Sequence, residues 1–149
     1  MDEALQELQR MIEDEMRRGY SEATVEHAMN PRNVGEMHGA DGHSRYTGPC
    51  GDTMEIWIKV DGDKILDARF WTDGCGASIA CGSMVTSMAS GRSLIEAMEM
   101  GKGDVLEALG GLPEENEHCA LLAATTLKLA ISDCLNRRDQ PWRKYYERL

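Results

Sequence analysis

Two stretches of the chain alternate apolar and polar residues with a period of two, and together they predict a β-hairpin. The first stretch covers residues 53–60, the second covers residues 66–71, and a turn at residues 61–63 separates them. Directly opposed residues of an antiparallel pair share one face of the sheet, so the apolar residues of the two strands should face each other. The matched pairs are Met54 with Phe70, Ile56 with Ala68, and Ile58 with Leu66.

The same register predicts which residues meet at the open end of the hairpin. Continuing it beyond the strands places Cys50 opposite Gly74 and Asp52 opposite Thr72. Cys50 and Cys75 should therefore be neighbours, with Asp52 beside them.

Helical periodicity accounts for most of the remaining chain. Apolar residues recur at spacings of three and four, and glycine, proline and polar capping residues bound the segments. The predicted helices cover residues 2–18, 20–30, 78–90, 93–98, 104–109 and 117–135, and the tail 140–149 is either a docked final helix or one that faces a partner. The first helix should dock on the body, pair with a second copy or fray, because a lone short helix is marginal in water. Residues 36–49 are expected to be largely irregular, with His38 and His43 solvated.

The five cysteines divide into two groups. Cys81 and Cys134 lie on the apolar stripes of predicted helices, which indicates packing in the core. Cys50 and Cys75 lie among glycines, and Cys119 lies in the first turn of a helix. The dipole at the start of a helix favours a thiolate, so Cys75 and Cys119 are expected to lose their protons easily. An odd number of cysteines also argues against a disulfide framework.

Composition and charge narrow the class of protein. The chain has 149 residues and a net charge of −10, with no long block of Lys or Arg, which argues against nucleic acid as the main partner. We expect that no run is apolar enough to span a membrane, and the start of the chain shows no apolar signal-peptide core. These features predict a cytoplasmic protein the size of one domain, with no membrane or nucleic-acid partner.

Thiol, carboxylate and imidazole side chains are candidates for a shared chemical site. They belong to Cys50, Asp52, Cys75, His118 and Cys119. Three thiolates with one nitrogen or oxygen ligand suit tetrahedral zinc or an iron–sulfur cluster. A catalytic pair of His118 and Cys119 is the alternative, but adjacent residues of a helix point about 100° apart, which is poor for direct proton transfer.

Five segments, in this order along the chain, resemble the U-type iron–sulfur cluster assembly scaffolds, the IscU/NifU-like family. They are His27–Gly35, Cys50–Asp52, Asp67–Phe70, Gly74–Ala80 and His118–Ala123. Because the resemblance spans about residues 20–136, we expect an N-terminal amphipathic helical extension over residues 1–19 and a scaffold domain over residues 20–149. It implies an α+β fold, in which helices cover a small antiparallel sheet of three strands and the last long helix is C-terminal. The third strand would come from residues 33–46.

The resemblance also implies a function. In this family the matching residues form an assembly site that takes sulfur from a cysteine desulfurase, binds iron, builds a [2Fe-2S] cluster and delivers it to apo-proteins. Here the matching residues are Cys50, Asp52, Cys75, His118 and Cys119. Cys119, or else Cys75 or Cys50, would receive sulfur as a persulfide, and Asp52, His118 and the thiolates would hold iron. The protein would be a scaffold and not an enzyme, compatible with homodimerisation and with zinc in its resting site.

The sequence departs from the family pattern in three places. Leu112–Asn116 replaces the Leu-Pro-Pro-Val-Lys motif that a specialised Hsp70-type chaperone reads, so this chaperone is not expected as a partner. Cys81 stands where serine is common. The zinc-dependent sulfur-transfer branch has a long insertion between its second and third cysteines. The interval from Cys75 to Cys119 leaves little room for one, which favours the scaffold branch. Two alternatives stay open: a zinc-containing sulfur acceptor that works with a desulfurase, and a zinc-stabilised interaction module.

Overall fold

The computed structural model describes residues 2–140, without the side chains of Met16 and Arg17, and shows an α+β fold. Its three-stranded antiparallel sheet has the order β1-β2-β3, formed by β1 (Gly42–Thr47), β2 (Thr53–Asp61) and β3 (Lys64–Thr72). The helices are α1 (Glu3–Gly19), α2 (Glu22–Met29), α3 (Gly76–Ala89), α4 (Leu94–Met98), α5 (Lys102–Ala108), the 3-10 helix η1 (Glu114–Asn116) and α6 (Glu117–Asp139). The predicted fold class is confirmed, and the third strand overlaps the stretch that was expected to supply it.

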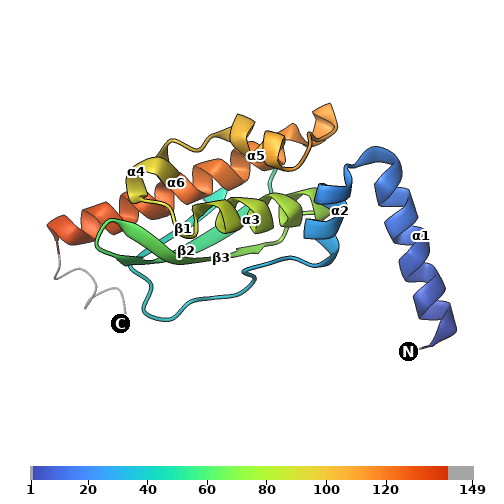
Figure 1. Cartoon of the computed structure of the whole chain (residues 1–149), viewed down its shortest axis with the longest axis horizontal. Coiled ribbons are helices and arrows are strands. Elements are labelled where there is room, and N and C mark those ends of the chain that lie inside the picture. The colour runs from blue at the N-terminus through green and yellow to red at the C-terminus, as the bar shows by residue number, and fades with distance from the viewer. Residues whose placement is uncertain (1, 141–149) are drawn as a thin grey trace.

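Helices α3 and α6 cover one face of the sheet and enclose the hydrophobic core (Figure 1). α6 lies against β1 and β2, and α3 lies against β3. The sheet residues that face these helices, Met54, Ile56, Ile58 and Phe70, are almost completely buried. Removing this apolar surface from water is the main source of stability, and it fixes the start of α6 relative to the hairpin.

The segment Glu114–Asp139, which includes α6, corrects the expectation about membrane-spanning runs. Within the described part of the chain, it is long and apolar enough to cross a membrane by length and composition alone. However, its residues Leu122, Leu127 and Ile131 are buried in the core. A core helix of a folded domain meets the same criterion, and α6 has that role here.

The β2–β3 hairpin does not have the predicted register. Met54 faces Thr72 and Ile56 faces Phe70, so each residue of β2 pairs two positions further along β3 than face-matching placed it. A β-bulge after Lys59 then shifts the last pairs by one residue. The apolar faces still meet, because a shift of two residues keeps every side chain on its own face.

The bulge also changes which residue of β3 enters the core. Ile65 is completely buried, whereas Leu66, which the sequence analysis placed on the core face, is 55% exposed. Face-matching assumed strict alternation along both strands, and a bulge interrupts that alternation by one residue. The turn is correspondingly tight, and Gly62 adopts a φ of 60°, which glycine accepts without strain.

Most predicted helices are present with small changes at their ends. α3 starts at Gly76, two residues before the predicted start, and α6 continues to Asp139. Ser21 caps α2, as expected from its position. One local expectation is wrong: His43 is not simply solvated, because its ring stacks on Trp57 and its Nε2 lies 3.0 Å from a carboxylate oxygen of Glu55.

Helix α1 projects from the body of the molecule (Figure 1). Its apolar side chains Leu5, Leu8, Met11 and Ile12 are 47–61% exposed. The alternative in which this apolar face docks on the body is therefore wrong, and pairing with a second copy stays a prediction. The tail from residue 141 onward lies outside the described residues, so its expected docked or partner-facing helix also stays a prediction.

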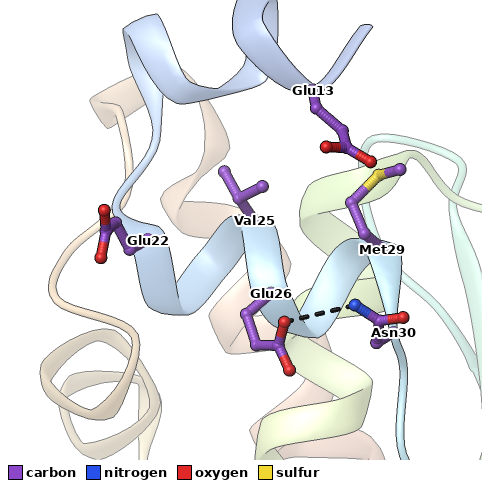
Figure 2. A pocket seen from close by; sticks show the side chains of 6 residues that line it. All are labelled: Glu13, Glu22, Val25, Glu26, Met29 and Asn30. Atoms are coloured by element: carbon purple, nitrogen blue, oxygen red, sulfur yellow. Dashed lines mark hydrogen bonds between the residues drawn. The ribbon is translucent and has the colours of Figure 1, made fainter. Parts of the chain in front are cut away.

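A cleft of about 250 Å³ lies between α1 and α2 (Figure 2). Three glutamates, Glu13, Glu22 and Glu26, line it together with Val25, Met29 and Asn30. The Asn30 amide donates a hydrogen bond of 3.2 Å to the Glu26 carboxylate. The cleft lies where α1 leaves the body of the molecule (Figure 1).

Candidate metal centre

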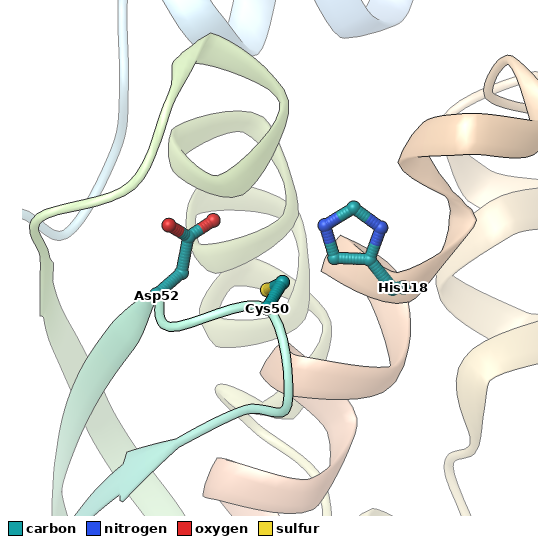
Figure 3. Close-up of side chains that lie close together, drawn as sticks. All are labelled: Cys50, Asp52 and His118. Atoms are coloured by element: carbon teal, nitrogen blue, oxygen red, sulfur yellow. The ribbon is translucent and has the colours of Figure 1, made fainter.

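Side chains from the β1–β2 turn and from the start of α6 converge at the open end of the hairpin (Figure 3). One ligand atom each from Cys50, Asp52 and His118 lies within 4.8 Å of the other two. The sequence alone could not establish that the start of α6 packs there. In the structure the start of α6 does pack at this end of the hairpin, because the buried face of α6 holds the helix against β1 and β2.

A tight turn sets the positions of Cys50 and Asp52. The N–H of Gly51 donates to the carbonyl oxygen of Gly48 at 3.0 Å, and the N–H of Gly48 donates to that of Asp52 at 2.9 Å. Gly51 has a φ of 94°, a conformation that residues with a side chain rarely adopt. Cys50 is therefore exposed at the tip of the turn, while Asp52 lies partly buried just before β2.

Cys75 and Cys119 occupy different environments although both lie near the start of a helix. Cys75 is the N-cap residue of α3 and is exposed. Cys119 is completely buried, and its Sγ lies 3.6 Å from Nε2 of His118. That distance corrects the expectation that these two neighbouring side chains point too far apart to exchange a proton.

The expectation that the helix start makes Cys119 a thiolate is also wrong for the metal-free chain. Burial raises the pKa of the Cys119 thiol to about 11, although a hydrogen bond from Ser78 lowers it in part. The nearby charges of Cys75 and Asp52 raise it further. Binding of a metal cation would therefore have to displace the proton from Cys119.

Ser78 is a further residue of the candidate site, and no motif in the sequence singles it out. Its hydroxyl lies 3.3 Å from Oδ2 of Asp52 and 3.4 Å from Sγ of Cys119, in the buried floor of the site. The available signal was its spacing, because a residue three positions after Cys75 lies over the same turn of the helix.

Tyr20 also reaches this end of the molecule. Its hydroxyl donates a hydrogen bond of 3.0 Å to the Asn116 side chain. The pKa of Tyr20 is raised by burial and then by the charges of Cys75 and Cys119. Asn116 was expected to cap α6, but it makes no side-chain capping bond there and accepts from Tyr20 instead.

The other two cysteines pack in the core, as predicted. Cys81 is completely buried and Cys134 is 2% exposed. Burial raises the pKa of both thiols, so both are protonated at neutral pH. All five cysteines are free thiols.

The donor set suits a soft or borderline cation better than a hard one. Cys50, Asp52 and His118 form the tight group, Cys119 joins it beside His118 and Ser78, and Cys75 lies close enough to Cys119 to raise its pKa. Thiolate sulfur and imidazole nitrogen are ligands of zinc and of iron–sulfur centres, and the carboxylate adds one hard oxygen. Exposure of Cys50 and Cys75 leaves one side of the site open to solvent.

Comparison with known proteins places this geometry in a family. The model of the NifU-like N terminal domain matches residues 19–141. Iron-sulfur cluster assembly scaffold protein IscU 1 of Archaeoglobus fulgidus is 48% identical over 122 residues, which cover 81% of this chain and 80% of that protein. The IscU scaffold protein of Escherichia coli is 42% identical over 125 residues, which cover 80% of this chain and 97% of that protein.

Solved structures show the same fold at lower identity. A putative iron-sulfur cluster assembly scaffold protein for the SUF system from Fervidobacterium islandicum superposes with a TM-score of 0.63 at 21% identity, covering 75% of this chain and 96% of that one. A NifU-like protein from Brucella abortus gives a TM-score of 0.54 at 18% identity, covering 80% and 94%.

Proposed function

The chain belongs to the NifU-like N-terminal domain family, and from this premise we propose that it is an iron–sulfur cluster assembly scaffold. In this proposal it receives sulfur from a cysteine desulfurase, binds iron, assembles a [2Fe-2S] cluster and transfers it to apo-proteins. The observation that carries the proposal is the convergence of Cys50, Asp52 and His118 within 4.8 Å, with Cys119 beside them.

The proposal gives each candidate ligand a role. Cys50, Cys75 and Cys119 supply thiolates, and Asp52 and His118 supply the remaining ligands. Cys119 is the proposed sulfur acceptor: its thiolate attacks the outer sulfur of the desulfurase persulfide, the S–S bond breaks, and the desulfurase cysteine leaves as a thiolate. His118 Nε2, 3.6 Å from Sγ of Cys119, is placed to take the proton that Cys119 must lose first.

The openness of the site supports a role in transfer. Cys50 and Cys75 are exposed, so a partner can reach a cluster held between them without unfolding the body. An apolar pocket of about 200 Å³ lies beside Cys50 and His118, lined also by Tyr46, Leu121 and Leu122. Partly exposed apolar surface next to the ligands is suited to a transient protein contact.

The proposal extends to the setting in which the protein acts. The protein has no turnover of its own and acts in the cytoplasm. Its free thiols suit the reducing conditions there. Its partners are a desulfurase and apo-proteins, without the specialised Hsp70-type chaperone.

The test is anaerobic incubation of the chain with ferrous iron, cysteine and a cysteine desulfurase, followed by visible spectroscopy and assays of iron and sulfide. The proposal expects a brown protein with equal iron and sulfide, and no colour from a Cys50→Ala/Cys75→Ala/Cys119→Ala variant. Zinc-loaded protein that takes up persulfide without forming a cluster would instead identify a sulfur acceptor. A colourless zinc-loaded protein that neither takes up persulfide nor forms a cluster would identify an interaction module.

A further inference from the structure

We propose that Ser78 is a positioning residue of this site, whose single hydroxyl proton is donated to the Asp52 carboxylate in the metal-free chain and to the Cys119 sulfur when that sulfur binds metal. The inference rests on the proposed function. It concerns the buried part of the site, where Ser78 and Cys119 lie.

The position of the Ser78 hydroxyl is the first support. Ser78 is completely buried, in the first turn of α3. Its Oγ lies 3.3 Å from Oδ2 of Asp52 and 3.4 Å from Sγ of Cys119, so one hydroxyl contacts candidate ligands from two other elements. A buried hydroxyl is costly unless it is hydrogen-bonded, and these two groups are the partners that the structure gives it.

Gly74 supplies the second support, because it leaves the space that this arrangement needs. A Cβ at position 74 would lie 2.5 Å from Oγ and 2.6 Å from Cβ of Ser78. It would also lie 3.1 Å from Oδ2 of Asp52. Any side chain at this position would therefore push Ser78 and the Asp52 carboxylate away from where they now lie.

The chemistry of a metal-bound thiolate explains what the contact does. A sulfur that binds a cation carries negative charge, and Cys119 is buried away from water, so a hydroxyl donor is the group that can stabilise this charge. Hydrogen bonds to the sulfurs of an iron–sulfur centre help to set its reduction potential. Partners that orient metal ligands also contribute to metal affinity, and their loss costs about ten- to a hundredfold.

Ser83 provides a matched control on the same helix. It is also completely buried, but its hydroxyl contacts Nδ1 of His27 at 2.7 Å and accepts from the N–H of Arg32 at 2.9 Å. Ser83→Ala therefore removes an equally buried hydroxyl without touching the site.

The experiment has two readouts on the full chain. The first is the affinity of the metal-free chain for Co²⁺, followed through the cobalt–thiolate absorption. The second is the reduction potential of the assembled cluster. Ser78→Ala is expected to lower the Co²⁺ affinity by about ten- to a hundredfold and to shift the potential to a more negative value. Gly74→Ala should shift both in the same direction, and Ser83→Ala should change stability while leaving both at the wild-type values.

Wild-type values of both readouts in Ser78→Ala would overturn the inference, and so would equal changes in Ser83→Ala. If the wild-type chain assembles no cluster, the proposed function fails, but the Co²⁺ titration still decides the role of Ser78. The two claims can therefore fail separately.

Discussion

Burial alone does not separate the cysteines of the site from the cysteines of the core, because Cys119 of the site is buried too. Cys50 and Cys75 are exposed near glycines, while Cys81 and Cys134 are buried in the hydrophobic core cluster. Cys119 is as buried as Cys81, yet it contacts the imidazole of His118 and the hydroxyl of Ser78. The comparison teaches that hydrogen-bonding contacts with polar side chains, rather than exposure, mark a buried thiol such as Cys119 as a candidate ligand.

The largest expected effect follows from removing an exposed thiol of the site. Cys50→Ala and Cys75→Ala should each abolish stable cluster binding, because each removes a soft ligand that no nearby residue replaces. Cluster absorbance after anaerobic assembly measures this, and Cys134→Ala is the matched control. A variant of Cys50 or Cys75 that keeps the full absorbance would break the division between the two groups of cysteines.

A smaller effect of the opposite sign is expected at Asp52. A carboxylate is a harder ligand than a thiolate and is displaced more readily, so Asp52→Ala should slow cluster loss and transfer severalfold while another donor such as His118 completes the site. The fold should survive, because Asp52 lies outside the core cluster. The decay of cluster absorbance with an apo-protein present is the measurement. Faster decay than in the wild type would make Asp52 an anchor and end the idea that it labilises the cluster.

Cys81→Ala tests the other side of the comparison. Assembly should be unchanged, and the free energy of unfolding should fall by only about 1 kcal/mol, because the side chain lost from the core is small. Denaturant unfolding and cluster assembly are measured on the same preparation. Loss of assembly with the fold intact would show that this thiol belongs to the site.

The burial of His27 predicts a modest pH dependence of stability. Burial, and then the charge of Arg32, lowers the pKa of His27 below its ordinary 6.5, although Glu26 opposes the shift. The unfolded chain then binds more protons at mildly acidic pH, so this contribution is present above about pH 6.5 and is lost as pH falls through the lowered pKa.

The measurement is the free energy of unfolding from about pH 7.5 to about pH 5. His27→Gln should show a shallower loss than the wild type, and His38→Gln, which changes an exposed residue, should behave like the wild type. Identical pH profiles for the wild type and His27→Gln would remove His27 from the account.

The smallest expected effect is no effect at all. A peptide of Leu112–Asn116 should not bind the specialised Hsp70-type chaperone, because Glu114 and Glu115 replace the apolar residues of its motif and Asn116 replaces its lysine. Fluorescence anisotropy of the labelled peptide, with a Leu-Pro-Pro-Val-Lys peptide as positive control, measures this. Binding in the micromolar range would contradict the expectation.

The sequence could predict elements more surely than the contacts between them. Alternation identified the hairpin and placed Cys50 and Asp52 at its open end, because a face pattern survives a register error of two residues. It could not reveal the bulge after Lys59, which depends on how the two strands twist together. The contact of His118 with the hairpin and the role of Ser78 depend on tertiary packing of α6 and α3, which no local pattern encodes.

The most direct test of the division among the cysteines is the iron and sulfide content of a Cys81→Ala/Cys134→Ala double variant after anaerobic assembly with a desulfurase. The account predicts the same iron and sulfide per folded chain as in the wild type, since both thiols are buried in the hydrophobic core. A double variant that keeps its circular dichroism spectrum but holds no cluster would contradict the claim that the thiols with polar neighbours are the ones that bind it.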